Sequence, residues 1–270
     1  MGERPAILSR GYGRRDAVDG VVVVRDPGGI RADLDRSGDE PLMLARQLDG
    51  VAVLVSPDRH LAGRLAERHF GCTVHVLDDG FQHFELRRDA DIVVVAREDV
   101  EGGRTLPAGR LREPVDVLES ADAMILLGET AVPVPRPVWR AHRTLQAVRA
   151  ADGSDPSPAP NGGPVLAVAG IAGPDGFFAD LRAAGWTIAR EMRFRDHHRY
   201  SRADVDAIAG AARQSGARAV LTTEKDLVRL LPFRPFPVPL AFAPLALRIE
   251  GAETFDSWLK ERVAVARLGP

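Results

Sequence analysis

Continuous apolar runs alternate with segments of helical periodicity along the first half of the 270-residue chain. Between the runs, PLMLARQLD and DRHLAGRLAER repeat apolar residues every three or four positions. Uninterrupted apolar runs are typical of parallel strands that are buried on both faces. The pattern therefore predicts an α/β fold with a mostly parallel sheet. The predicted strands are PAILS (5–9), VAVLV (51–55), TVHVL (73–77), ADIVVVA (90–96) and ADAMILLG (121–128).

A stretch rich in Pro, Gly and Ser, residues 129–163, separates this block from a second one. It encloses a short extended piece, HRTLQAVRA, and has the composition of a connector. Beyond it, PVLAVAGI, WTIAREMRF and ARAVLTTEKD predict strands. GPDGFFADLRAAG predicts a helix that stops at Gly185, and SRADVDAIAGAARQSG a helix capped by Ser201. We therefore expect a core domain over 1–135, an extended hinge over 136–163 and a smaller α/β domain over 164–270.

Composition narrows the classes of protein that this chain can represent. The formal net charge is −2, which gives no general attraction to nucleic acid or to a membrane surface. The single cysteine, Cys72, excludes an intramolecular disulfide and a cysteine-based zinc site. No run of 18 apolar residues and no signal-peptide pattern occurs, so we expect no membrane-spanning helix.

Charged side chains follow several predicted strands at the points where these strands end. In open α/β sheets, ligands bind beyond the carboxyl ends of the strands. Asp78 and Asp79 come directly after TVHVL, and a Mg²⁺ ion that bridges substrate phosphates takes one or two such carboxylates. DDG also suits a tight turn. The buried strand before it and FQH after it favour a magnesium site.

Two other segments carry residues that are suited to catalysis. Asp39 and Glu40 stand at the start of a predicted helix. Acidic residues at this position also stabilise the helix amino terminus, and the residues alone slightly favour this structural role over a catalytic one. His197 and His198 in RDHHRY are suited to binding a metal, to relaying a proton or to lying in a solvated loop. DHH also resembles the motif of the DHH phosphoesterases, but no DxD ending an early strand accompanies it.

The loop GRTLPAGRLREP (103–114) is long and non-repetitive, and long ordered loops tend to be functional. Arg110 and Arg112 would present guanidinium forks to a phosphate or a carboxylate. An ordinary charged surface loop is the alternative interpretation.

Several stretches occur together in an order that resembles one family. They are ILSRGYGRR, GDEPLMLARQ, VLVSPDRHLAGRL, VLDDGFQHFELRRDADIVVV, LPAGRLREP, AGIAGPDGFFADLRAAG, FRDHHRYSRADV and LTTEKDLVRL. The chain resembles the tetraacyldisaccharide 4′-kinases, which phosphorylate a lipid A precursor with ATP. The resemblance covers about residues 5–260, and DDGFQH, LPAGRLREP and TTEKD in this order are its most specific part.

The resemblance implies a P-loop NTPase-like core joined by an extended hinge to a second, smaller α/β domain. It implies ATP and Mg²⁺ as cofactors and a lipid A disaccharide precursor as the acceptor, with no nucleic-acid partner. It also implies peripheral contact with the cytoplasmic face of the bacterial inner membrane, although this chain alone could be soluble in the cytoplasm.

The resemblance also implies roles for single residues. Asp39 would accept the proton of the sugar hydroxyl, with His197 as its partner and His198 as the alternative partner. Arg110 receives no role, because the family commonly has a different residue type at its position. The implied metal-binding residues are Asp78, Asp79 and Glu40. The implied residues of the nucleotide and acceptor cleft are Arg59, Gln82, His83, Arg112 and Glu113.

One element of the family has no counterpart, because no GK[ST] occurs in the sequence. The family carries its phosphate-binding loop upstream of the LSRGYGR strand. Its loss would remove the amides and the lysine that hold the phosphates, and with them most of the nucleotide affinity and nearly all of the rate. Three interpretations remain open: a fragment or a late start codon, a pseudoenzyme that binds the lipid precursor without phosphoryl transfer, and a metal-dependent phosphoesterase. If an upstream strand is missing, we expect PAILS to expose an unpaired apolar edge.

Overall fold

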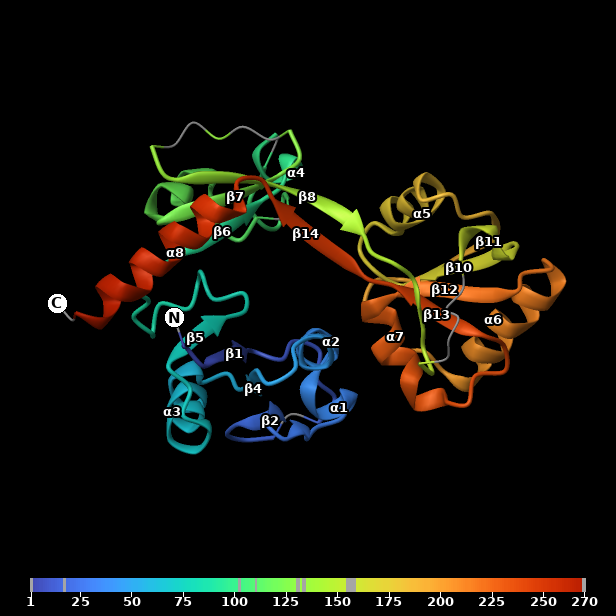
Figure 1. Ribbon diagram of the computed structural model, residues 1–270, viewed down its shortest axis with the longest axis horizontal. Coiled ribbons are helices and arrows are strands. Elements are labelled where there is room, and N and C mark those ends of the chain that lie inside the picture. The colour runs from blue at the N-terminus through green and yellow to red at the C-terminus, as the bar shows by residue number, and fades with distance from the viewer. Residues whose placement is uncertain are drawn as a thin grey trace. The chain divides into compact units, whose positions relative to one another are not determined.

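The computed structural model describes residues 2–16, 18–101, 103–109, 111–129, 132, 135–153 and 159–268 (Figure 1). Contacts divide the chain into two compact units. The larger unit consists of Gly2–Asp79 and Leu145–Leu245, and the smaller consists mainly of Gly80–Thr144 and Ala246–Pro270. The expected boundaries at 135 and 163 stay a prediction, and residues 154–158 of the expected hinge lie outside the described residues.

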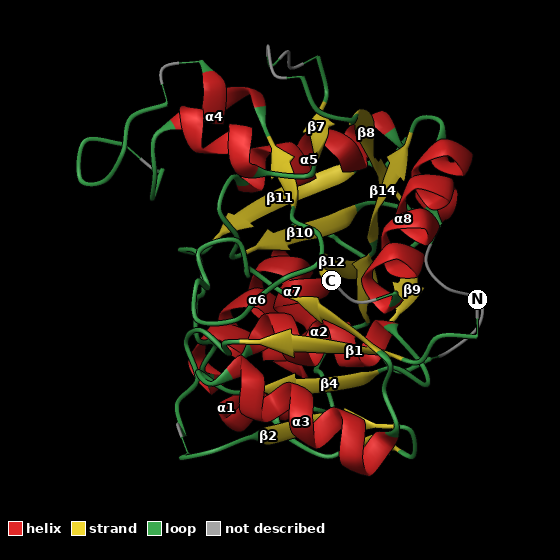
Figure 2. Cartoon of the chain, turned by 90° about the vertical axis from the view of Figure 1, so that its left-hand side faces the viewer, coloured by secondary structure: helices red, strands yellow, loops and turns green. Residues whose placement is uncertain are grey.

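The first sheet of the larger unit has the strand order β3-β2-β4-β1-β5. β1 pairs in parallel with β4 and β5, whereas β2 pairs antiparallel with β4 and β3. α3 packs against β1 and β4 (Figure 2). The strands are β1 (Pro5–Ser9), β2 (Val22–Asp26), β3 (Gly29–Ile30), β4 (Ala52–Val55) and β5 (Val74–Leu77), and the helices are α1 (Leu34–Ser37), α2 (Asp39–Gln47) and α3 (Arg59–Phe70).

The expectation of an unpaired edge on PAILS is wrong. These residues form β1, which has a ladder partner on each side and whose residues from Ala6 to Ser9 are buried. The partner on the second side is β5, which includes most of TVHVL. Because β5 pairs only with β1 in the described part of the chain, it ends the sheet, and Val76 is 52% exposed.

The second sheet of the larger unit has the order β11-β10-β12-β13-β9, in which only β9 is antiparallel to its neighbour. Alternate residues of β10 face opposite sides: Val165 and Ala167 pack with α5, and Leu166 and Val168 pack with α6 and α7. Helices therefore cover both faces. The strands are β9 (Arg149–Ala150), β10 (Val165–Ala169), β11 (Ile188–Arg193), β12 (Ala219–Thr223) and β13 (Leu240–Ala243), and the helices are α5 (Pro174–Ala183), α6 (Arg202–Gln214) and α7 (Glu224–Leu230), with 3-10 turns at Pro160–Gly162 and Leu231–Phe233.

The smaller unit contains a sheet of the order β14-β8-β7-β6. β6, from ADIVVVA, pairs only with β7 among the described residues, and Val94 is 50% exposed. The sequence predicted complete burial of both β5 and β6, which is wrong because each ends its sheet in the part of the chain that the structure describes. The elements are β6 (Ile92–Val95), α4 (Arg97–Val100), a 3-10 helix (Val115–Ser120), β7 (Ala123–Leu127), β8 (Val138–Leu145), β14 (Leu245–Ile249) and α8 (Ala252–Arg267). Across the described ranges, no helix combines the length and apolarity needed to span a membrane.

Candidate functional site

Asp39 is the first residue of α2 and is buried, with 7% of its surface exposed. Gly38, between α1 and α2, has a φ of 85°, and a Cβ there would lie 3.0 Å from the carbonyl oxygen of Tyr12. This glycine allows the chain to turn sharply, so that α2 starts against the Tyr12 loop. The Oδ1 atom of Asp39 accepts a hydrogen bond from the Glu40 amide at 3.2 Å.

Arg229 of α7 provides the charge that neutralises Asp39. Its Nε donates to Oδ2 of Asp39 at 2.7 Å, and its Nη2 donates to the same oxygen. Burial alone raises the pKa of Asp39, but the hydrogen bond with Glu40 and the charge of Arg229 lower it by more, so the pKa lies well below its ordinary value. Asp39 is therefore ionised at neutral pH. Sequence reasoning missed Arg229, although a charged residue between Val228 and Leu230 was a signal for a buried ion pair.

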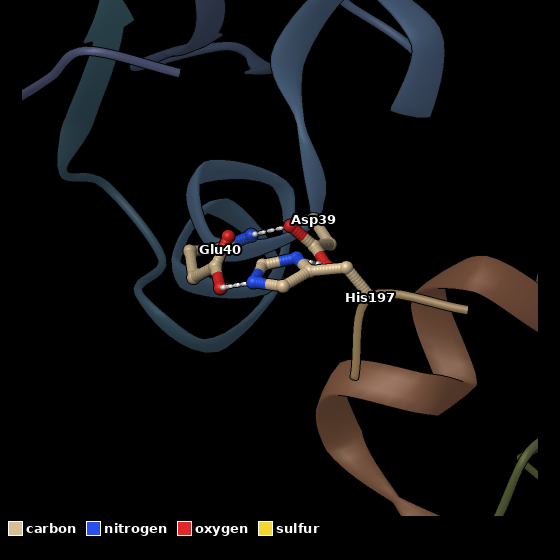
Figure 3. Close-up of side chains that lie close together, drawn as sticks. All are labelled: Asp39, Glu40 and His197. Atoms are coloured by element: carbon tan, nitrogen blue, oxygen red, sulfur yellow. Dashed lines mark hydrogen bonds and ion pairs between the residues drawn. The ribbon is translucent and has the colours of Figure 1, made fainter. Parts of the chain in front are cut away.

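His197 lies in the loop after β11 and joins Asp39 from a distant part of the chain (Figure 3). Its Nδ1 lies 3.1 Å from Oδ2 of Asp39, and its Nε2 lies 3.3 Å from Nζ of Lys225. Because an ammonium only donates, this arrangement fits the tautomer in which Nδ1 carries the proton and Nε2 accepts. His197 has a φ of 53°, a conformation that costs energy for a non-glycine residue.

His198 does not join this group. Its Nε2 lies 3.2 Å from Oδ2 of Asp204, the residue that forms a capping box with Ser201 at the start of α6. The ring also packs against Phe194 and Tyr200. Of the two candidate histidines, the structure therefore brings only His197 to Asp39.

Glu40 lies on the other side of the imidazole, with Oε1 3.8 Å from Nε2 of His197 and 2.5 Å from Nζ of Lys225. Burial and the hydrogen bond with Asp39 raise the pKa of Glu40 against the opposing effect of Lys225. Ligand atoms of Asp39, Glu40 and His197 lie within 4.8 Å of one another, close enough to hold a cation. Lys225 and Arg229 already neutralise both carboxylates, so a metal ion at this point would compete with the Lys225 ammonium.

Asp78 and Asp79 follow β5 directly, as predicted. The buried Ser9, at the end of β1, donates from Oγ to Oδ2 of Asp78 at 2.9 Å. This hydrogen bond aligns the Asp78 carboxylate at the carboxyl edge of the sheet. Such an aligned carboxylate fits the hard, oxygen-seeking Mg²⁺ ion.

Arg59 begins α3 and is 3% exposed. Its Nη1 donates to the carbonyl of Pro57 at 3.1 Å, whereas its Nε has no hydrogen-bond partner among the described residues. Burial and the charge of Arg10 lower the pKa of Arg59, and the nearby Asp78 and Asp79 oppose this. A buried guanidinium N–H without an acceptor fits an anion such as a nucleotide phosphate.

The other predicted cleft residues belong to the smaller unit. Nε2 of Gln82 lies 3.4 Å from Oε2 of Glu113, and Nη1 of Arg112 lies 3.4 Å from Oε1 of Gln82, so these three side chains meet. His83 follows in the same turn, where its amide donates to Gly80. Arg110, which has no assigned role, lies outside the described residues.

The sheets are mostly parallel, and they present carboxylates, a buried arginine and an Asp–His pair. Together with the fold, these features define the class of α/β phosphotransferases with a P-loop kinase-like fold. The model of the tetraacyldisaccharide-1-P 4′-kinase family, LpxK, matches residues 1–264. The chain belongs to this family.

Two relatives and one solved structure illustrate the similarity. Tetraacyldisaccharide 4′-kinase from Koribacter versatilis is 39% identical over 261 residues, which cover 92% of this chain and 75% of that protein. The enzyme of the same name from Bradyrhizobium diazoefficiens is 39% identical over 270 residues, with 98% and 75% covered. The crystal structure of LpxK from Aquifex aeolicus in complex with ATP matches with a TM-score of 0.80 and 28% identity, covering 97% of this chain and 79% of that one. These similarities confirm the predicted family and fold class.

Proposed function

We propose that this protein transfers the γ-phosphoryl group of ATP to the 4′-hydroxyl of a tetraacyldisaccharide 1-phosphate. The observation that carries the proposal is the contact between the buried Asp39 and the partly exposed His197, which come from distant segments of a chain that belongs to the 4′-kinase family. ATP as the donor is supported by the ATP complex of the similar Aquifex aeolicus protein.

In the proposed reaction, the 4′-oxygen attacks the γ-phosphorus, the bond from that phosphorus to the β,γ-bridging oxygen breaks, and the hydroxyl proton passes to Asp39. A low pKa keeps Asp39 ionised and ready to accept, although it makes the carboxylate a weak base. A weak base suffices when the transition state is loose, because the hydroxyl proton then leaves late. His197 orients the carboxylate through its Nδ1–H.

The nucleotide side of the reaction is assigned to the aligned residues at the edge of the first sheet. Asp78 and Asp79 would hold Mg²⁺, which when bound neutralises the leaving phosphates. Arg59 would donate its unpartnered Nε–H to a phosphate oxygen. Gln82, His83, Arg112 and Glu113, in the smaller unit, are proposed to bind the nucleotide or the acceptor, and Glu40 is proposed as a further ligand of the cation.

We also propose that the protein works in peripheral contact with the cytoplasmic face of the bacterial inner membrane, because a tetraacylated acceptor resides in a lipid layer. The phosphoesterase alternative loses support, because His198 contacts Asp204 at the start of α6 and does not join Asp39 and Glu40. A nucleic-acid partner is not part of the proposal.

The test is an assay of the chain with radiolabelled ATP, Mg²⁺ and tetraacyldisaccharide 1-phosphate in detergent micelles. We expect a lipid product with a second phosphate, formed by the wild type and strongly reduced for Asp39→Asn. An acceptor whose 4′-hydroxyl is methylated is the substrate control and should gain no label. Absence of any Asp39-dependent product would overturn the proposal, and retention of the lipid without transfer would instead support a binding protein.

A further inference from the structure

The segment TTEKD, which forms the end of β12 and the start of α7, builds a buried polar network. Asp226 within it is fully buried. Its Oδ2 accepts from Oγ1 of Thr223 at 2.7 Å and from the amide of Gly170 at 2.9 Å. Its Oδ1 accepts from the hydroxyl of Tyr200 and from Nη1 of Arg229, both at 3.1 Å. Four donors thus hold this carboxylate in one orientation.

Arg229 continues the network from Asp226 to Asp39. Its Nη1 also donates to the carbonyl of Gly170 at 2.7 Å, and its Nε and Nη2 both reach Oδ2 of Asp39. The three charged side chains are each less than a tenth exposed. A planar guanidinium whose nitrogens have fixed partners on two sides can rotate very little.

The two oxygens of Asp39 differ as a result. Oδ2 accepts from Arg229 and lies against Nδ1 of His197, whereas Oδ1 accepts from the Glu40 amide at 3.2 Å. We infer that Arg229, held by Asp226, is a positioning residue. Its hydrogen bonds occupy Oδ2 of Asp39, so that Oδ1 is the oxygen that accepts the proton of the sugar hydroxyl. This inference rests on the proposed function of Asp39.

A purely structural role for Arg229 is the alternative. α2 and α7 pack against each other, and Gln47 of α2 donates to Glu224 of α7 at 2.7 Å. Arg229 could therefore simply join these two helices. The two roles predict different results. If Arg229 positions Asp39, its substitution should lower the rate more than another substitution that destabilises the protein to the same extent.

The matched pair of variants is Arg229→Lys and Thr222→Val. Lysine keeps the charge but replaces the planar fork with a single donor group. Thr222 lies in β12, is fully buried and donates to the carbonyl of Val168 at 2.9 Å, so Thr222→Val removes a buried hydrogen bond without touching Asp39. We expect Arg229→Lys to lower kcat roughly 100-fold with KM for ATP and lipid nearly unchanged, because a small misplacement at a reacting group is that costly. Thr222→Val should lose thermal stability but keep kcat.

In an Asp39→Asn background, Arg229→Lys should cause no further loss of kcat, since residues that act as a unit are not additive. A kcat for Arg229→Lys that matches the wild type, or that falls only as much as in Thr222→Val, would overturn the inference. So would a full additional loss in the Asp39→Asn background.

A second readout does not depend on turnover. The chain is labelled with ¹⁵N-histidine, and the His197 imidazole signal is assigned by its disappearance in His197→Gln. The wild type and Thr222→Val should show a protonated Nδ1 with slow exchange, and Arg229→Lys should show a broadened or absent Nδ1–H signal, because the Asp39 carboxylate is then free to rotate. An unchanged signal in Arg229→Lys would overturn the positioning role. If the wild type transfers no phosphate, the proposed function fails, and this signal still shows whether Arg229 positions the Asp39 carboxylate.

Discussion

Nδ1 of His197 lies 3.1 Å from Oδ2 of Asp39, although the two residues are 158 positions apart in the chain. Each side of the pair is prepared by its own segment. The turn at Gly38 places Asp39 at the start of α2, and His197 adopts a left-handed backbone conformation with a φ of 53°. The contact also brings together the first α/β block and the second one within the larger unit.

The two adjacent histidines should behave differently on substitution. We expect His197→Gln to lower the rate of phosphoryl transfer by about 100-fold, because an oriented acid–base pair contributes at least that much. His198→Gln is the matched control: it removes the contact with Asp204 and the ring packing against Phe194 and Tyr200, so the rate should be retained while the protein loses about 1–2 kcal/mol of stability. Steady-state kinetics and urea unfolding of both variants check this. Equal losses of rate would contradict the distinction between the two histidines.

The strands could be predicted from sequence because each is a short apolar run, and the runs at PAILS, VAVLV and ADAMILLG form the buried strands β1, β4 and β7. Ser201 also caps α6 as predicted. Strand order was not predictable, because the apolar composition of β1 and β5 is similar while only β5 ends its sheet in the described chain. The β2–β3 hairpin was missed because its strands are short and its polar turn resembles a loop.

The site was only partly predictable for a related reason. From local pattern alone, the role of Asp39 at a helix amino terminus was slightly favoured, and its catalytic interpretation came from the family resemblance. Lys225 and Arg229 had no assigned role, because their contacts with Glu40 and Asp39 depend on how α7 packs against α2. A lysine and an arginine four residues apart fit a solvated helix face as well as a buried one.

Asp39→Asn should abolish most of the activity while preserving the fold. We expect a decrease in kcat of roughly 10²–10⁴-fold, the usual contribution of a proton-accepting group. Asp49→Asn is the control, since the side chain of Asp49 is 92% exposed and pairs with Arg25 at the surface. The measurement is the initial rate of lipid phosphorylation at saturating ATP. A comparable decrease for Asp49→Asn would indicate that surface charge, rather than the buried carboxylate, sets the rate.

Acid unfolding should reveal the ionised state of Asp39. Because its pKa is lowered in the folded protein, its stabilising contribution is complete above the ordinary carboxyl pKa of about 4 and is lost as the pH falls toward the lower folded value. The free energy of unfolding of the wild type should therefore exceed that of Asp39→Asn by more at pH 7 than at pH 3, with most of the change below about pH 5.

Glu40→Gln is a control for which the change of stability with pH should have the opposite sign. The pKa of Glu40 is raised in the folded protein, so its ionisation costs stability as the pH rises past its ordinary value. Relative to the wild type, Glu40→Gln should therefore gain stability between pH 4 and pH 7. Urea unfolding between pH 3 and pH 7 measures both variants, and a pH-independent difference between the wild type and Asp39→Asn would contradict the assigned ionisation of Asp39.

The Ser9–Asp78 hydrogen bond should control Mg²⁺ affinity if Asp78 binds the ion as proposed. Ser9→Ala removes the donor that aligns Oδ2 of Asp78, so the Mg²⁺ concentration for half-maximal transfer should rise by roughly tenfold, as for other residues that orient metal ligands. Ser56→Ala is the matched control, because Ser56 is also a buried serine at the end of a strand of the same sheet but donates to Gly20 instead. Titrations with Mg²⁺ at fixed ATP compare the two. Identical half-saturation in both variants would exclude Ser9 from the metal site and would remove the structural support for placing Mg²⁺ on Asp78.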